Sequence, residues 1–149
     1  MLELMVICWK ATQVSPIHNH GKYDQTDGSK FHLENQHCWA AVLQGTIEET
    51  HFQFKNTHSA VGSGPLEIVS KGIHHSGEVS YIHDDIALHV LRPINGEAGV
   101  TLHLYSKPIA QCNIYDPETG QITRRKCGFY TVNKVLQENV TCQTLPSTQ

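Results

Sequence analysis

The sequence predicts an all-β fold, either a sandwich or a barrel, built from short strands. Runs rich in Val, Ile, Leu, Thr and aromatic residues recur along the 149-residue chain. Turn-forming clusters such as GSGP, INGE and DPETG separate these runs, and no long amphipathic helical pattern lies between them. Many short strands at fairly even spacing are typical of β-sandwiches and β-barrels.

Ten segments have the composition of strands. The opening run LELMVICW is the first, and SPIHNH follows after a short polar stretch. Farther along, only two residues separate CWAAVL from TIEETHFQF, and the apolar runs ALHVL and VTLHLY flank the INGE turn. The ten expected strands are residues 2–9, 15–20, 38–43, 46–54, 66–69, 78–82, 87–91, 100–105, 112–115 and 129–132.

One polar segment interrupts this pattern. Residues 23–35, YDQTDGSKFHLEN, are rich in turn formers, and we interpret them as a surface loop or insertion. Lengthening a connection by this much costs only about 1 kcal/mol of closure entropy, so the flanking strands can still pair. Residues 138–149 are polar and are expected to form a disordered tail. Residues 1–149 are therefore predicted to form a single domain.

Charge and composition exclude several classes of function. The chain has 11 basic and 14 acidic residues and a net charge of -3, so nucleic acid is not an expected partner. The apolar run 2–9 is too short to span a bilayer and lacks signal-peptide features, so a cytoplasmic protein without membrane association is expected. The five cysteines, at positions 8, 38, 112, 127 and 142, include no CxxC pair, which argues against a disulfide scaffold.

The spacing of three histidines indicates a metal site. His18 and His20 lie two residues apart, so a strand would place both side chains on one face. Such a pair alone is equally consistent with a solvated or hydrogen-bonded pair. His89 lies inside an apolar run, where a histidine is more often a core residue than a ligand. The two early histidines and the later one would, however, form a ligand set on separate strands that leaves one face of a metal ion open.

Polar residues alternate with leucines in the segment TLHLY. Thr101, His103 and Tyr105 therefore share one face of the expected strand, and Leu102 and Leu104 share the other. If the polar face lines the interior of a barrel, it lies close to the metal site. If the leucines face the core instead, which is the commoner arrangement in antiparallel sheets, the polar face meets water. The spacing does not decide between the two.

Five separated motifs together resemble the cysteine dioxygenase family. They are LMVICW, SPIHNH, HCWAAVLQGTIEET, SYIHDDIALHV and TLHLYSKP, the last followed by Cys112, and their order and spacing match over about residues 2–122. The resemblance implies a cupin double-stranded β-helix, a jelly-roll barrel, which agrees with the all-β prediction. It also implies one Fe(II) per chain, with His18, His20 and His89 as its ligands.

The same resemblance implies roles for Cys38, His103 and Tyr105. Cys38 takes the position of the cupin glutamate and would form the family's thioether crosslink with Tyr105, while His103 would orient the Tyr105 hydroxyl. The implied reaction is oxidation of the thiol of L-cysteine by O2 to cysteine sulfinic acid, a step of cysteine catabolism. Both oxygen atoms enter the product without a reducing cosubstrate, and a monomer is expected.

Two features depart from the family. The family's carboxylate-binding arginine lies upstream of the LMVICW motif, where this chain starts, and the arginines here are Arg92, Arg124 and Arg125. The spacing between SPIHNH and HCWAAV is also longer, by about the length of residues 23–35. We therefore expect a chain that is truncated at its N-terminus relative to the family, and that binds Fe(II) but oxidises cysteine weakly.

Three alternative functions are compatible with the sequence. Three imidazoles and a water form a zinc hydrolytic centre, although such a centre has no evident use for Cys38 and Tyr105. The second alternative is a non-catalytic or weakly active metal-binding cupin fragment. The third alternative is a dioxygenase for another small thiol, such as a mercapto acid or cysteamine.

Overall fold

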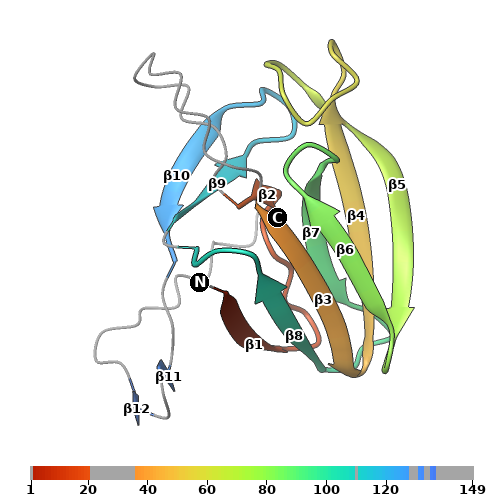
Figure 1. The fold of residues 1–149 in the computed structure, drawn as a ribbon. Helices are drawn as coiled ribbons and strands as arrows, with labels where there is room; N and C mark the ends of the chain where they lie inside the picture. Colours follow the sequence, from red (N-terminus) through yellow and green to blue (C-terminus); the bar gives the residue numbers. More distant parts are fainter. Residues whose placement is uncertain (1, 21–35, 110, 128–130, 133–134, 137–149) are drawn as a thin grey trace.

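The computed structural model describes residues 2–20, 36–109, 111–127, 131–132 and 135–136, and no described residue lies in a helix (Figure 1). The prediction of an all-β fold is confirmed. The strands are β1 (Glu3–Trp9), β2 (His18–Asn19), β3 (His37–Gln44), β4 (Thr46–Phe54), β5 (Leu66–His75), β6 (Val79–His83), β7 (Leu88–Pro93), β8 (Gly99–Tyr105), β9 (Gln111–Tyr115), β10 (Ile122–Lys126), β11 (Thr131–Val132) and β12 (Val135–Leu136).

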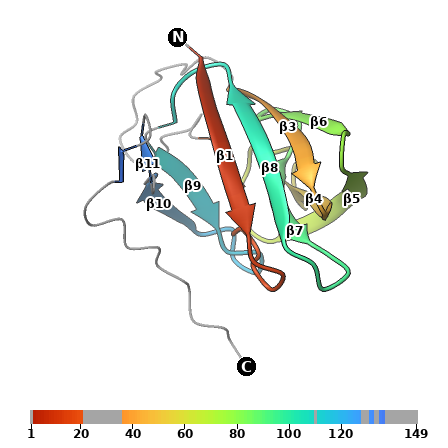
Figure 2. The same ribbon diagram turned by 90° about the horizontal axis from the view of Figure 1, so that it is seen from below.

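Two antiparallel sheets make up the body of the molecule. One has the strand order β1-β8-β3-β6, and the other has the order β10-β9-β2-β7-β4-β5. Neighbouring strands within a sheet are mostly not consecutive in sequence, so the chain passes repeatedly from one sheet to the other; Figure 2 shows β1 beside β8, for example. This arrangement is that of a cupin jelly roll.

The core contains three clusters of buried apolar residues. One includes Cys38 and Tyr105, a second includes Phe54 and Leu88, and the third includes Trp9. An unusual number of polar side chains is buried as well, and buried polar groups are costly unless they are paired. The most completely buried of these are Asn19, Glu49, Asp84, His89, Thr101, His103 and Asn113, and His20 is buried as well.

Most strands lie where the sequence predicts them. Strands β1, β3, β4 and β6 to β9 agree with the expected segments to within two residues at each end. β5 continues beyond the expected end to His75, because its polar second half remains paired with β4. β10 was not predicted, because ITRRK is highly charged, yet it forms the edge of its sheet against β9. An edge strand exposes one side to water and tolerates such charges.

Two expectations concern residues that the structure does not describe. Residues 23–35 and 138–149, the expected insertion and tail, lie outside the described residues. In the described part of the chain no helix is long and apolar enough to cross a membrane. The outer face of β1 is apolar and exposed at Leu4 and Val6.

Candidate metal centre

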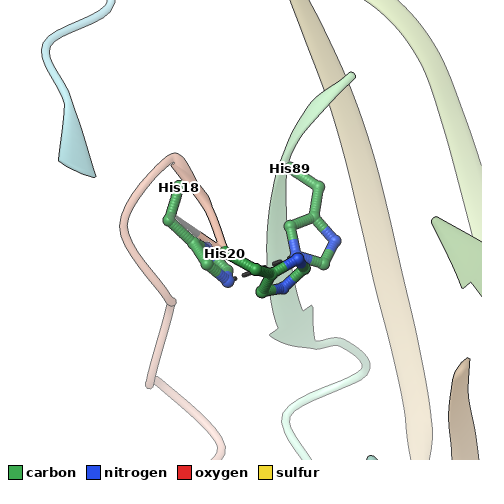
Figure 3. Close-up of side chains that lie close together, drawn as sticks. All are labelled: His18, His20 and His89. Carbon is green, nitrogen blue, oxygen red and sulfur yellow. Dashed lines mark hydrogen bonds between the residues drawn. The ribbon is translucent and has the colours of Figure 1, made fainter. Parts of the chain in front are cut away.

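Two neighbouring strands of the larger sheet bring three histidines together. His18 and His20 lie in and directly after the short strand β2, and His89 lies on β7, where it is paired with His18 across the sheet. Figure 3 shows the three rings pointing toward one another. One ligand atom from each ring lies within 4.8 Å of the other two, and no other group of His, Cys, Asp or Glu among the described residues meets this criterion.

The Nδ1 atom of each imidazole, which points away from the other two rings, lies near an oxygen atom. His18 Nδ1 lies 3.0 Å from the carbonyl oxygen of Pro16, and His89 Nδ1 lies 2.7 Å from Glu49 Oε1. His20 Nδ1 makes a longer contact of 3.3 Å with Asp84 Oδ1. A carbonyl or carboxylate oxygen only accepts, so the partners of His18 and His89 favour the tautomer with the proton on Nδ1, whereas His20 Nδ1 makes no hydrogen bond to a described residue. The Nε2 atoms of His18 and His89 then each present a free lone pair to the interior.

These lone pairs fit a divalent cation. The Nε2 atoms of His18 and His89 are 3.2 Å apart, and two lone pairs facing each other at this distance repel unless a positive charge lies between them. Burial lowers the pKa of both side chains, and the neighbouring imidazoles lower it further, so a proton is a poor source of that charge. The Nε2 atom of His20 is buried without a hydrogen-bond partner among the described residues.

Glu49 fixes the position of His89 from behind. Its carboxylate, on β4, is buried and also lies 3.4 Å from the Nε2 atoms of His51 and His74. Burial opposes ionisation, but the hydrogen bonds from His51 and His89 outweigh it and hold the pKa of Glu49 well below its usual range. Glu49 is therefore an ionised acceptor. Neither Glu49 nor Asp84 is among the site residues that the sequence predicts, although Glu49 lies in the motif HCWAAVLQGTIEET and Asp84 in SYIHDDIALHV.

A second group of side chains comes from the smaller sheet. Cys38 on β3 is paired directly with Tyr105 on β8, and both are buried. His103 lies beside them: its Nδ1 is 3.7 Å from Cys38 Sγ and 3.4 Å from the Tyr105 hydroxyl. Thr101, His103 and Tyr105 are buried while Leu102 and Leu104 are half-buried, so the polar face of β8 is the interior face.

The hydrogen bonds of this group lead from Trp9 toward Tyr105. Trp9 Nε1 is only a donor, and it donates to Thr101 Oγ1 at 2.9 Å. Thr101 Oγ1 also lies 2.8 Å from His103 Nε2, and donation by the Thr101 hydroxyl pairs its proton with that nitrogen. In this tautomer the His103 proton lies on Nδ1, facing Tyr105, and the Tyr105 hydroxyl proton can point elsewhere. Burial lowers the pKa of His103 to about 4, which keeps it neutral.

Cys38 and Tyr105 are both protonated in this environment. Burial, assisted by the charge of Glu49, raises the pKa of the Cys38 thiol to about 12. Burial also raises the pKa of Tyr105, and the nearby Cys38 raises it further. A neutral thiol and a neutral phenol therefore lie side by side.

A single cavity of about 180 Å³ joins the two groups. The ring of Tyr105 lies 5.3 Å from that of His20, measured between centroids. Most of the lining is apolar, and Glu3 is the one carboxylic side chain in it among the described residues. The lining consists of Glu3, Met5, Ile7, Trp9, Ser15, Pro16, His18, His20, Leu91, His103, Tyr105, Ile109, Cys112 and Cys127.

No cation of the described residues lines this cavity. Arg92 lies on the outside of β7, where its Nη2 and Nε are 2.8 and 2.9 Å from Glu48 Oε1. Within the described part of the chain, no arginine lines this cavity.

Comparison with known proteins identifies related sequences. The profile of a family described as cysteine dioxygenase type I matches residues 1–118. Cysteine dioxygenase type 1 from Homo sapiens is 30% identical over 146 residues, which cover 96% of this chain and 64% of the human protein. The Bos taurus protein of the same name is 34% identical over 121 residues, covering 79% of this chain and 51% of that protein. The chain thus spans less than two thirds of the length of these relatives.

Proposed function

Because the chain belongs to the cysteine dioxygenase type I family, we propose that it is an iron-dependent dioxygenase that oxidises the thiol of L-cysteine to cysteine sulfinic acid. The convergence of three Nε2 atoms next to a cavity that also holds Tyr105 supports this proposal best. The proposal includes a monomer that acts in the cytoplasm. Free thiols at Cys8, Cys38, Cys112 and Cys127 fit a reducing compartment.

His18, His20 and His89 would hold one Fe(II) through their Nε2 atoms. When bound, ferrous iron supplies open coordination positions and the redox capacity to activate O2. Three neutral imidazoles leave the full charge of the ion, so an anionic thiolate is attracted to the site. Zinc accepts the same ligands, but Cys38 and Tyr105 beside the histidines favour oxidation over hydrolysis.

Tyr105 would stabilise the reacting substrate from the opposite sheet. With its proton on Nδ1, His103 would donate to the Tyr105 oxygen and leave the hydroxyl proton available to the cavity. A donor preorganised in an apolar, water-poor cavity stabilises negative charge that develops on sulfur or oxygen far better than water does. The apolar lining from Met5, Ile7 and Leu91 would also exclude water from the reactive species.

Cys38 and Tyr105 would become joined by a thioether bond. The two residues are directly paired on β3 and β8, and a hydrogen bond joins the thiol and the phenol. The bond removes one hydrogen from each residue, and O2 is the oxidant. Crosslinking would fix the Tyr105 ring, so the catalytic set of this proposal is Cys38, His103 and Tyr105.

A second candidate substrate is a small thiol that carries an amine but no carboxylate, such as cysteamine. The cavity lining has no Lys or Arg among the described residues, and Glu3 contributes a carboxylate whose Oε2 accepts from the backbone N–H of Ile109 at 2.8 Å. An ammonium group is attracted to this carboxylate, whereas the carboxylate of cysteine is repelled. Weak oxidation of cysteine and stronger oxidation of cysteamine would favour this candidate.

The test is sulfinate production by purified, iron-loaded protein with cysteine, cysteamine and 3-mercaptopropionate under air. Mass spectrometry identifies each sulfinate, and the His89→Ala variant is the control for metal-independent oxidation. The proposal expects at least one thiol to be converted by the wild type and not by the variant. Conversion of none, with iron retained, would identify the chain as a non-catalytic metal-binding cupin.

A further inference from the structure

Two cysteines that the proposed chemistry does not use lie in the wall of the same cavity. Cys112 on β9 is paired with Arg125 on β10, and Lys126 is the last paired residue of β10. Cys127 directly follows β10, two residues beyond Arg125. Both thiols line the cavity, and Cys127 packs against the core cluster that contains Tyr105.

The two thiols interact with each other, and the interaction makes them chemically unequal. Each is half-buried, and a hydrogen bond joins their sulfur atoms. That hydrogen bond, helped by the charge of Arg125, lowers the pKa of Cys112 to about 7. The same hydrogen bond and burial raise the pKa of Cys127. Cys112 is thus the more acidic thiol of the pair, and Cys127 is the thiol that supports its ionised form.

We propose that Cys112 and Cys127 are a redox pair that forms a reversible disulfide in the wall of the cavity by exchange with a small disulfide. In the first step the Cys112 thiolate attacks the small disulfide, the S–S bond of that disulfide breaks, and one small thiolate leaves. In the second step Cys127 loses its proton and attacks Cys112 Sγ, and the second small thiolate leaves. Two protein thiols are oxidised, and one small disulfide is reduced to two thiols.

The strand geometry permits this bond. Sulfur atoms already in hydrogen-bond contact must approach to about 2.05 Å. Cys127 follows the last residue pair of the β9–β10 ladder, so its backbone can adjust without breaking a ladder hydrogen bond. The bond would tie β10 to the segment of β9 that pairs with β2, since Asn113 pairs with Asn19 between His18 and His20. Oxidation therefore alters the wall beside the metal ligands.

The first experiment measures the bond itself. The iron-loaded full chain is treated with bis(2-hydroxyethyl) disulfide, a small neutral probe, and analysed by intact mass and non-reducing peptide mapping. We expect linked Cys112 and Cys127 peptides that dithiothreitol separates, whereas a thioether would persist. The Cys127→Ser variant should stop at a mixed disulfide on Cys112, and the Cys8→Ser variant, which removes an exposed thiol, should still form the link.

Two outcomes would overturn the proposal at this stage. One is a wild type that carries only mixed disulfides. The other is a Cys112→Ser variant in which Cys127 reacts as fast as Cys112 does in the wild type, because the predicted inequality of the two thiols would then be absent.

The second experiment measures the consequence of the bond, and this part rests on the proposed function. The oxidised wild type should form sulfinate severalfold more slowly than the reduced protein and recover with dithiothreitol. The double variant Cys112→Ser/Cys127→Ser should be insensitive to the probe. A disulfide that forms without changing the rate would refute the effect on turnover. A chain with no sulfinate activity would refute the proposed function, while the mass analysis would still decide whether the pair forms.

Discussion

The substitution Glu49→Gln tests whether the carboxylate behind His89 positions the metal ligand. Glu49 Oε1 accepts the His89 Nδ1 proton at 2.7 Å, and the carboxylate is only 3% exposed. Glutamine keeps the size of the side chain and one acceptor oxygen but removes the negative charge. The variant therefore loses the charge-assisted part of the hydrogen bond while the cavity stays filled.

The expected loss of metal affinity follows from the position of Glu49. Removing such an outer partner of a ligating histidine weakens metal binding by about 10–100-fold. That range corresponds to about 1.4–2.7 kcal/mol of binding free energy. We expect a loss of affinity in the upper half of this range, because the neutral glutamine also lacks the charge that Glu49 presents to His51 and His74.

The assay is anaerobic competition for Fe(II) between the protein and a chromogenic chelator, which gives the Kd of each variant. Glu48→Gln is the matched control, since Glu48 is adjacent on β4 but faces outward and pairs with Arg92 and Lys71. Its Kd should equal that of the wild type. An unchanged Kd for Glu49→Gln, in a variant with the thermal stability of the wild type, would refute the role assigned to Glu49.

Three further predictions follow from the same site. Alanine at His18, His20 or His89 should abolish stoichiometric iron after dialysis, whereas His58→Ala, at an exposed position, should not; full iron in His89→Ala would exclude the ligand set. After turnover, peptide mapping should show a Cys38–Tyr105 link that resists reductant and is absent from Cys38→Ser; unlinked peptides alone would argue against the crosslink. The depressed pKa of His103, about 4 against an ordinary 6.5, contributes stability that is fully present above pH 6.5 and is lost as pH falls toward 4. Chemical denaturation should show the free energy of unfolding falling by about 3 kcal/mol as the pH falls over this range, and falling less in the His103→Asn variant. An equal dependence on pH in both proteins would refute the assignment.

The histidine cluster could be predicted because its signal is local. Two histidines two residues apart on a strand must share a face, and His89 interrupts a run of apolar residues that is otherwise typical of a core strand. The inward orientation of His103 could not be predicted, because alternation is the same whichever face is buried. Contacts with distant segments decide it: Cys38 lies against His103 Nδ1, and Trp9 hydrogen-bonds to Thr101, the partner of His103 Nε2, so the buried imidazole is paired.

The residues behind the histidines could not be predicted at all. Glu48 and Glu49 are adjacent and identical in type, and an acidic residue on a strand is usually solvent-exposed. Only the register between β4 and β7, which pairs Glu49 with Leu91 and His51 with His89, places the Glu49 carboxylate behind the His89 ring. Such a register depends on long-range pairing, which a local sequence pattern does not specify.

The two sheets supply different kinds of chemistry to one cavity. The larger sheet provides the three imidazoles. Two buried acidic side chains lie behind them: Glu49 on the same sheet, and Asp84, which directly follows β6 of the smaller sheet. The smaller sheet also provides hydrogen bonds from Trp9 through Thr101 to His103, which end at Tyr105. Trp9 Nε1 can only donate, and donation from Thr101 to His103 pairs the buried Thr101 hydroxyl proton. The orientation of the Tyr105 hydroxyl thus depends on the smaller sheet, whereas the candidate metal ligands lie on the larger one.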